Sequence, residues 1–405
     1  MCGNKTLGNL FAVGVMALVA VLSAVCIPRG INAALRRRPG ASPKASVCER
    51  LSSRFPMKPR FVELNGGVAR AVGRRCCNKR LRYRNGMIGH AYGVSGRCIT
   101  NGCREVSVEL SFASRLRERG VPFLFVLAPC KMSFDGGLMP YGWRCDNQNA
   151  ESRAVARMLA DSGVEVLDLV PRYASTTEDV GRHFFATDHH WNIRTALDAT
   201  GAVCDRLGEI LGRPELCGNP RLSISSWERH VLKGDFVGSH GRRTGSLFSG
   251  TEGFEYFLPL FETEQESFVP GERKRRRGNF EAVEFDGKYL RPEQREWRWL
   301  AYGGPAHGLK VHRNLAPSAN LRCMVVKDSF GRHPVAFLST VFGEVVEVDP
   351  RLTEGDQTVE WAVDFYKPDV VVMIANPSSV LSQRWLKGME NGVKGKDVEN
   401  ALHVH

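Results

Sequence analysis

The fold is decided by residues 323–331, which read CMVVKDSFG. An uninterrupted apolar run is typical of a β-strand that is buried on both faces of a sheet. The run ends at Asp328 and Ser329, and a glycine and a predicted helix follow. This strand–turn–helix pattern predicts an α/β fold, in which the serine lies at the carboxyl edge of the sheet, where such folds bind ligands.

Strand and helix patterns alternate on both sides of this segment. Strands are predicted at 121–128, 164–169, 345–348 and 370–375, and helices at 107–119, 150–162, 193–211, 334–342 and 358–366. The alternation favours a mainly parallel sheet flanked by helices. The stretch 213–318 shows no clear period, so we expect an irregular insertion there.

The N-terminus carries a second signal. Residues 7–28 contain no charged side chain and are about as long as a membrane-spanning helix. A buried core helix and a cleaved signal peptide are the alternatives, but the run exceeds a usual signal core and no clear small-residue cleavage site follows it. We therefore expect an uncleaved N-terminal transmembrane helix within residues 1–28, a juxtamembrane linker at 29–60 and a catalytic domain at 61–405.

Charge bears on the location of the protein and on its partners. The 405 residues include 56 Lys and Arg against 43 Asp and Glu, a net charge of +13 that suits anionic partners. Arginines directly after the apolar run favour a cytoplasmic body, yet large domains translocate largely regardless of charge. We expect a single-pass protein of the cell membrane with its catalytic domain outside the cytoplasm.

A basic run and the cysteines are two further features that bear on binding. The basic run 273–277 is either a solvated loop or a contact for acidic glycan or lipid headgroups, and no nucleic-acid-binding motif accompanies it, so we expect no nucleic-acid partner. Twelve cysteines are present, but none has a zinc-like spacing. Cys204 and Cys323 lie on predicted apolar faces, where free buried thiols are expected.

Residues 187–192 read TDHHWN and form the densest cluster of reactive side chains. In a turn, an Asp two residues before a His can hold the imidazole through Nδ1 and leave the other ring nitrogen as a base. A metal site is the alternative, although adjacent histidines point in different directions. A serine at a helix start is by itself most often an N-cap. Together, the two segments predict a triad of Ser329, His190 and Asp188.

These segments resemble the DHHW proteins, relatives of the alginate O-acetyltransferases AlgJ and AlgX. The resemblance covers about residues 61–378 and rests on TDHHW at 187–191 and KDSFG at 327–331. Supporting landmarks lie at 64–66, 84–86, 128–131, 238–245 and 348–351. The resemblance implies an SGNH-hydrolase-like fold of permuted chain order. It also implies an O-acetyltransferase that acts on a cell-surface or secreted polysaccharide through an acyl-serine.

The same resemblance implies a multi-pass membrane acyltransferase as the supplier of acetyl groups, which fits the predicted anchor. No cofactor and no metal are expected. Because no additional carbohydrate-binding domain is expected after the last predicted strand, the identity of the polymer does not follow from the family. A carbohydrate acetylesterase with the same triad and a non-catalytic glycan-assembly protein remain the alternatives.

Three further residues are weaker candidates for binding the substrate or an oxyanion. Lys131 follows a predicted strand and either holds an anionic group or is simply exposed. Arg351 ends another strand and either lines the pocket or forms a salt bridge with Asp349 or Asp328. Phe330 follows the serine, where backbone N–H groups can help to bind an oxyanion.

Overall fold

The structure is a computed structural model that describes residues 58–90, 102–143, 147–353, 358–382, 385 and 387–389. The expected transmembrane helix within residues 1–28 lies outside these described residues. Within the described ranges, no helix combines the length and the apolar character that crossing a bilayer requires. One compact unit begins at Gly66.

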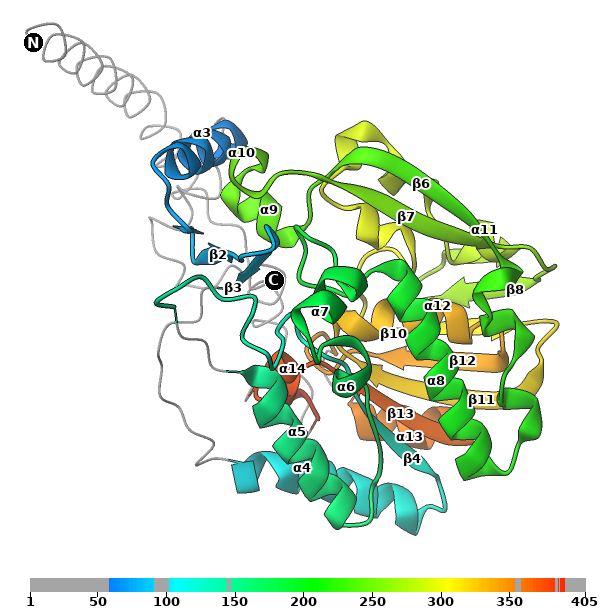
Figure 1. The fold of residues 1–405 in the computed structure, drawn as a ribbon. Coiled ribbons are helices and arrows are strands. Elements are labelled where there is room, and N and C mark those ends of the chain that lie inside the picture. Colours follow the sequence, from blue (N-terminus) through cyan, green and yellow to red (C-terminus); the bar gives the residue numbers. More distant parts are fainter. Residues whose placement is uncertain are drawn as a thin grey trace, which may run out of the picture. The chain divides into compact units, whose positions relative to one another are not determined.

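An eight-stranded sheet forms the centre of this unit, in the order β5-β4-β13-β11-β12-β10-β8-β9 (Figure 1). The strands are β5 (Glu165–Asp168), β4 (Phe123–Leu127), β13 (Val370–Ala375), β11 (Ala319–Lys327), β12 (Phe342–Val348), β10 (Leu309–Asn314), β8 (Gln265–Phe268) and β9 (Arg275–Gly278). The first five are parallel and the last three are antiparallel. The expected mainly parallel α/β sheet is confirmed, and every residue of β4 and β13 is buried, as their apolar runs predict.

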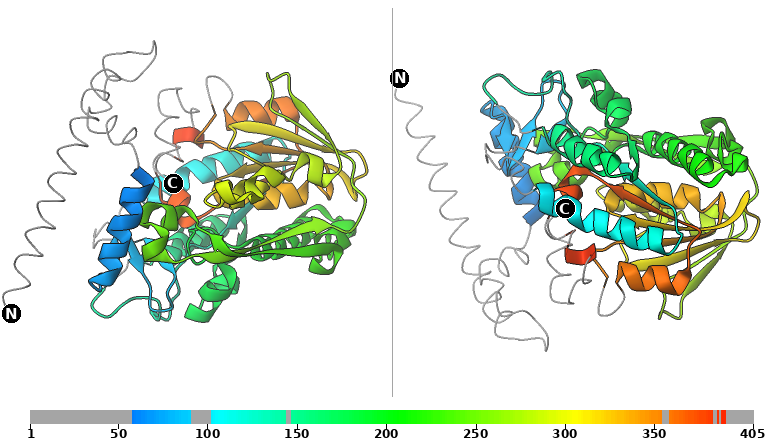
Figure 2. Two further views of the ribbon diagram at one scale, coloured as in Figure 1. Left: turned by 90° about the horizontal axis from the view of Figure 1, so that it is seen from above. Right: turned by 90° about the horizontal axis from the view of Figure 1, so that it is seen from below.

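Helices cover both faces of the sheet, with α4 and α13 on one face and α8 on the other (Figure 2). The helices at the predicted positions are α4 (Gly102–Glu118), α5 (Gln148–Asp161), α8 (Ile193–Leu211), α12 (Arg332–Leu338) and α13 (Val359–Tyr366). All five predicted helices are present. The helix expected at 334–342 ends earlier, because residues 339–341 form the turn that returns the chain to β12.

The other α-helices and the first three strands are short, apart from the 14-residue α3. They are α3 (Lys58–Ala71), α6 (Val170–Tyr173), α7 (Thr177–His183), α9 (Ser239–Thr244), α10 (Ser246–Ser249), α11 (Phe280–Val283), α14 (Pro377–Val380), and the strands β1 (Cys76–Cys77), β2 (Arg80–Arg82) and β3 (Ile88–His90).

The stretch 213–318 is more regular than its sequence predicts. It contains an antiparallel pair, β6 (Trp227–Phe236) and β7 (Glu252–Pro259), and it also supplies β8, β9 and β10 to the central sheet. The expectation of an irregular insertion was wrong because β6, β7, β8 and β9 are partly exposed and the buried strand β10 carries Lys310 and His312. Charged side chains interrupt the apolar pattern on their solvent faces, as the sequence RRRG of β9 illustrates.

The order of the parallel strands places the end of β11 at a special position. The chain continues from β11 to β12 on one side and then crosses to β13 on the other side. In open α/β sheets, ligands bind outside the carboxyl ends of the strands at such a reversal. Ser329 lies two residues after the end of β11 and therefore at this switch point.

The buried thiols of Cys204 and Cys323 are free, as their apolar faces predict. Burial raises the pKa of Cys204 to about 12 and also raises that of Cys323. Both side chains therefore stay protonated at neutral pH and pack as small apolar groups.

Candidate active site

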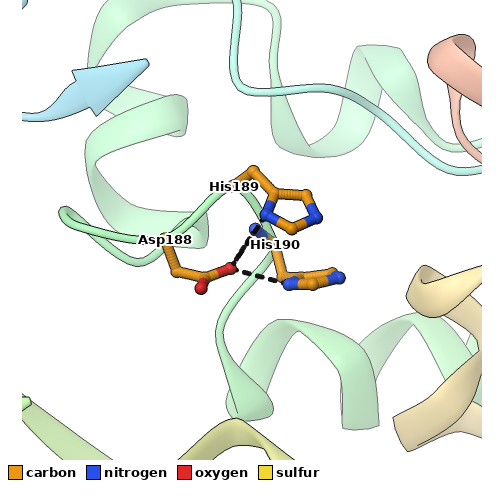
Figure 3. Close-up of side chains that lie close together, drawn as sticks. All are labelled: Asp188, His189 and His190. Carbon is orange, nitrogen blue, oxygen red and sulfur yellow. Dashed lines mark hydrogen bonds and ion pairs between the residues drawn. The ribbon is translucent and has the colours of Figure 1, made fainter. Parts of the chain in front are cut away.

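Asp188 and His190 form a buried pair in the turn that precedes α8 (Figure 3). Asp188 Oδ1 lies 2.7 Å from His190 Nδ1 and also accepts the backbone N–H of His190 at 2.9 Å. One oxygen can make both contacts only if the chain turns between the two residues. Because an ionised carboxylate only accepts hydrogen bonds, Nδ1 carries the proton and Nε2 is left as the basic nitrogen.

The Asp188 carboxylate stays ionised although it is completely buried. Burial by itself would raise its pKa, but the two neighbouring histidines and the hydrogen bonds that the carboxylate accepts hold the pKa well below its ordinary value. One of these bonds comes from the N–H of Ser239, the first residue of α9, which donates to Oδ2 at 2.6 Å. Gly238 permits this approach, because a Cβ at that position would lie 2.3 Å from the Asp188 Cβ.

The buried Lys131 and the half-buried Glu252 hold the backbone of the segment 185–188. The Lys131 ammonium lies 2.5–3.0 Å from four carbonyl oxygens, those of Ile88, Phe185, Ala186 and Asp188. The Glu252 carboxylate accepts the N–H groups of Ala186 and Thr187 and the Thr187 hydroxyl. Lys131 is therefore not exposed, and its ammonium binds the turn that carries Asp188. Glu252 had no signal in the sequence, since it lies in a stretch without a clear period.

Burial has opposite effects on these two charges. It lowers the pKa of Lys131 to about 8, although the nearby carboxylates of Glu252 and Asp188 raise it. It raises the pKa of Glu252, although the hydrogen bonds from Thr187 and Ala186 lower it. The two side chains lie close enough to interact, so each offsets part of the cost of burying the other.

Ser329 begins a short 3₁₀ turn at the end of β11 and is 8% exposed. The preceding residue, Asp328, fixes this turn, since its Oδ1 accepts the Phe330 N–H at 2.7 Å. Its Oδ2 accepts the backbone N–H and the side-chain amide of Asn376, both at 2.8 Å. Asn376 directly follows β13, so Asp328 joins the ends of the two strands that flank the switch point.

Ser329 Oγ and His190 Nε2 are both buried, and neither has a hydrogen-bond partner. The ring of Phe330 lies 5.0 Å from the His190 ring and 5.4 Å from the Trp191 ring. The turn that carries Ser329 thus packs against the imidazole, but no hydrogen bond joins the two side chains. Such contacts are often loose without substrate. The contact between Asp188 and His190 is present, and a triad that includes Ser329 stays a prediction.

Trp299 is a component of the site that sequence reasoning missed. Its indole ring stacks on His190 with a centroid separation of 4.4 Å. Its carbonyl oxygen accepts a hydrogen bond from His333 Nε2 at 2.9 Å, and the Arg332 guanidinium lies 4.9 Å from its ring centroid. Both of these residues begin α12, the helix that follows Ser329. Trp299 therefore connects the base to the helix of the candidate nucleophile.

The weaker candidates make local contacts instead of facing open space. Arg351 forms a two-pronged ion pair with Asp349, from Nε to Oδ1 at 2.8 Å and from Nη2 to Oδ2 at 2.7 Å, which is the alternative that the sequence left open. The Phe330 N–H is already donated to Asp328, so only its ring faces His190.

A metal ion fits the cluster poorly. Ligand atoms of Asp188, His189 and His190 lie within 4.8 Å of one another. However, both carboxylate oxygens of Asp188 already accept hydrogen bonds, and His189 Nδ1 lies 2.6 Å from Ser239 Oγ. The carboxylate oxygens of Asp188 and the Nδ1 atom of His189 are therefore already engaged in contacts that orient these side chains.

A small cavity of about 40 Å³ adjoins the pair. It is lined by Tyr83, Gly89, His90, Cys130, Lys131, Met132, Gln148, His189, His240, Phe330, Asn376 and Ser378. The lining includes His189 and Phe330, which are the chain neighbours of His190 and Ser329. It also includes Asn376, whose side chain joins the end of β13 to Asp328. The cavity has room for a group of a few atoms, but neither Ser329 nor His190 itself lines it.

A family model matches part of this chain. Residues 106–236 match the family model of the SGNH hydrolase-like domain of acetyltransferase AlgX. This segment contains Asp188 and His190 and ends before Ser329. No curated protein is significantly similar in sequence.

Several solved structures share the fold. PatB1 of Bacillus cereus is 17% identical, with a TM-score of 0.59 over 74% of this chain and 95% of PatB1. PatB1 with a sulfonyl adduct gives a TM-score of 0.60 at 15% identity, over 77% of this chain and 98% of that one. A DHHW family protein from Eubacterium siraeum is 16% identical, with a TM-score of 0.56 over 79% of this chain and 98% of that one. The expected resemblance to DHHW and AlgX-like proteins is confirmed.

Proposed function

We propose that this protein is an O-acetyltransferase that modifies a cell-surface or secreted polysaccharide through an acetyl-Ser329 intermediate. The observation that carries the proposal is the buried pair of ionised Asp188 and His190, whose unbonded Nε2 lies in the same packed cluster as the Ser329 turn. The match of residues 106–236 to an acetyltransferase domain supports acetyl as the transferred group.

The reaction runs as a double displacement. His190 Nε2 takes the proton of Ser329 Oγ while Oγ attacks the carbonyl carbon of an acetyl donor, and the donor's leaving group departs with that proton. A sugar hydroxyl then attacks the acetyl-serine. His190 takes the hydroxyl proton and returns it to Ser329 Oγ, so the product is a sugar acetate and the enzyme is restored. Asp188 stabilises the imidazolium in both steps.

A carbohydrate acetylesterase would use the same residues, with water in place of the sugar hydroxyl in the second step. The two reactions therefore differ only in the molecule that reaches the acetyl-serine, and a direct experiment must separate them.

The proposal includes a location and a supplier of acetyl groups. The uncharged run at residues 7–28 would anchor the chain, with the catalytic domain outside the cytoplasm. A multi-pass membrane acyltransferase would deliver acetyl groups to that side. Protease accessibility of residues after Pro28 in intact cells tests this arrangement, and protection of the catalytic domain in intact cells would contradict it.

The chemical test uses the purified full chain and an activated acetyl ester. Acetyl should accumulate on Ser329 and be visible by mass spectrometry in the tryptic peptide 328–332, and Ser329→Ala should abolish it. Because PatB1 has been solved with a sulfonyl adduct, a sulfonyl fluoride is a second probe of the same serine. Added oligosaccharide should speed the loss of acetyl beyond hydrolysis. Equal rates with every acceptor would favour the esterase, and no adduct with either probe would overturn the proposal.

A further inference from the structure

The positive charge near the start of the compact unit is not neutralised locally. Residues 66–90 contain seven Lys and Arg side chains and no Asp or Glu. Arg70, Arg74, Arg75 and Lys79 are exposed, and within the described ranges none of them forms an ion pair with a carboxylate. We call these four residues, together with the exposed Val68, Val72 and Leu247, the basic surface.

Charge crowding is evident beside these four residues. Arg82 Nε is buried and has no hydrogen-bond partner. Burial lowers the pKa of Arg82, and the positive charges of Arg70 and Arg75 lower it further. Like charges gathered in this way favour the binding of an anion.

The basic run 273–277, which the sequence suggested as an anion contact, is different. Arg275 pairs with Glu266 and Arg277 pairs with Glu264, each at 3.1 Å. Exposed pairs of this kind contribute little to stability, but they cancel charge. Of the two basic segments, the basic surface is therefore the better site for an anionic partner.

Exposed aliphatic side chains neighbour these charges, two of them along the chain and one in space. Val68 is 53% exposed, Val72 is 65% exposed and Leu247 of α10 is 56% exposed. Leu247 adjoins the end of α3, because Arg70 Nη1 donates to its carbonyl oxygen and a Cβ on Gly67 would lie 3.0 Å from Leu247 Cδ1. Apolar and basic side chains on one surface suit a lipid interface, where the former enter the headgroup region and the latter bind anionic headgroups. A soluble polyanion would use only the charges.

We propose that the basic surface docks onto a bilayer rich in anionic lipid headgroups. The proposal goes beyond the acyl-transfer function and does not depend on it. A rigid connection joins this surface to the candidate active site: Arg80 of β2 donates from Nε to His240 Nδ1 at 2.9 Å, and α9, which carries His240, begins with the N–H that binds Asp188. Docking would therefore set the orientation of the active site relative to the membrane.

The test uses the full chain in lipid nanodiscs and measures hydrogen exchange of the peptide amides. Residues 68–84 should exchange more slowly in discs of phosphatidylcholine with phosphatidylglycerol than in discs of phosphatidylcholine alone. The double variant Arg74→Glu with Arg75→Glu should reduce this lipid-dependent slowing at least about tenfold, because each basic side chain at the surface contributes measurably to lipid binding. The matched control is Arg273→Glu with Lys274→Glu, an adjacent exposed pair without an ion pair.

Unchanged exchange in β11 and β13 shows that each variant is folded. The proposal is overturned if the two lipid compositions give the same exchange, or if both charge-reversal variants lose the slowing equally. It is also overturned if slowing appears with soluble polygalacturonate but not with phosphatidylglycerol, since the partner would then be an acidic polymer.

Discussion

Asp188→Asn tests the part of the site that the structure describes most fully. Three N–H groups point at the carboxylate, two from His190 to Oδ1 and one from Ser239 to Oδ2. Asparagine offers one acceptor oxygen and one NH₂ group. If the oxygen faces Ser239, the NH₂ group faces Nδ1 and favours the tautomer whose proton is on Nε2, which removes the base. If the oxygen faces His190, the NH₂ group meets the Ser239 N–H, and the unpaired buried donors cost about 1–3 kcal/mol.

We therefore expect Asp188→Asn to slow acetylation of Ser329 by on the order of 10⁴, as the equivalent change does in a comparable triad, which corresponds to about 5 kcal/mol in the barrier. The assay is the burst of nitrophenol released from p-nitrophenyl acetate, with the adduct confirmed by mass spectrometry. Circular dichroism checks that the variant is folded. Because triad members act as a unit, adding His190→Ala should cost little more. A folded Asp188→Asn variant that retains a rate within tenfold of the wild type would refute the assigned role of the carboxylate.

Three further predictions concern the residues around the pair, each with a matched variant. Gly238→Ala should lower both the thermal stability and the rate of acetylation, because its Cβ would overlap the Asp188 side chain. Gly201→Ala is the matched variant: this glycine lies in α8 with open space around it, so alanine should raise the free energy of unfolding by about 0.5–1 kcal/mol. Thermal unfolding of the two variants measures both effects. Lys131 has a pKa lowered to about 8 when folded, so the unfolded chain binds more protons between pH 8 and its ordinary pKa of 10.5. The free energy of unfolding of the wild type should therefore rise with pH in this window relative to Lys131→Met, and equal slopes in urea titrations would contradict the shift. Trp299→Leu should slow acetylation of Ser329 about tenfold, whereas Trp299→Phe should keep most of the rate, because a smaller ring still stacks on the imidazole of His190. Equal rates of acetylation in the two variants would show that stacking is irrelevant.

The sequence predicted the parts of this protein that depend on near neighbours along the chain. The runs at 121–128 and 370–375 are apolar at every position because both faces of β4 and β13 are covered, so their burial was readable directly. The Asp-x-His spacing likewise predicted the contact between Asp188 and His190, because a turn of three residues brings these side chains together without help from the rest of the fold.

Other parts were decided only by the tertiary structure. Lys131 looked like a surface or pocket residue, but its ammonium binds carbonyl oxygens that belong to distant segments, at Ile88 and at 185–188. Trp299 and Glu252 reach the site from a stretch whose strands are half exposed and whose pattern is interrupted by charges.

The candidate site itself shows the same division. Sequence alone determined which residues are chemically able to form a triad and placed Ser329 at the end of a buried strand. Nearly 140 residues separate that serine from His190, and the two turns meet through the packing of Phe330 against His190 and Trp191. Contacts between distant segments depend on the path of the whole chain, so no local pattern of residues encodes them.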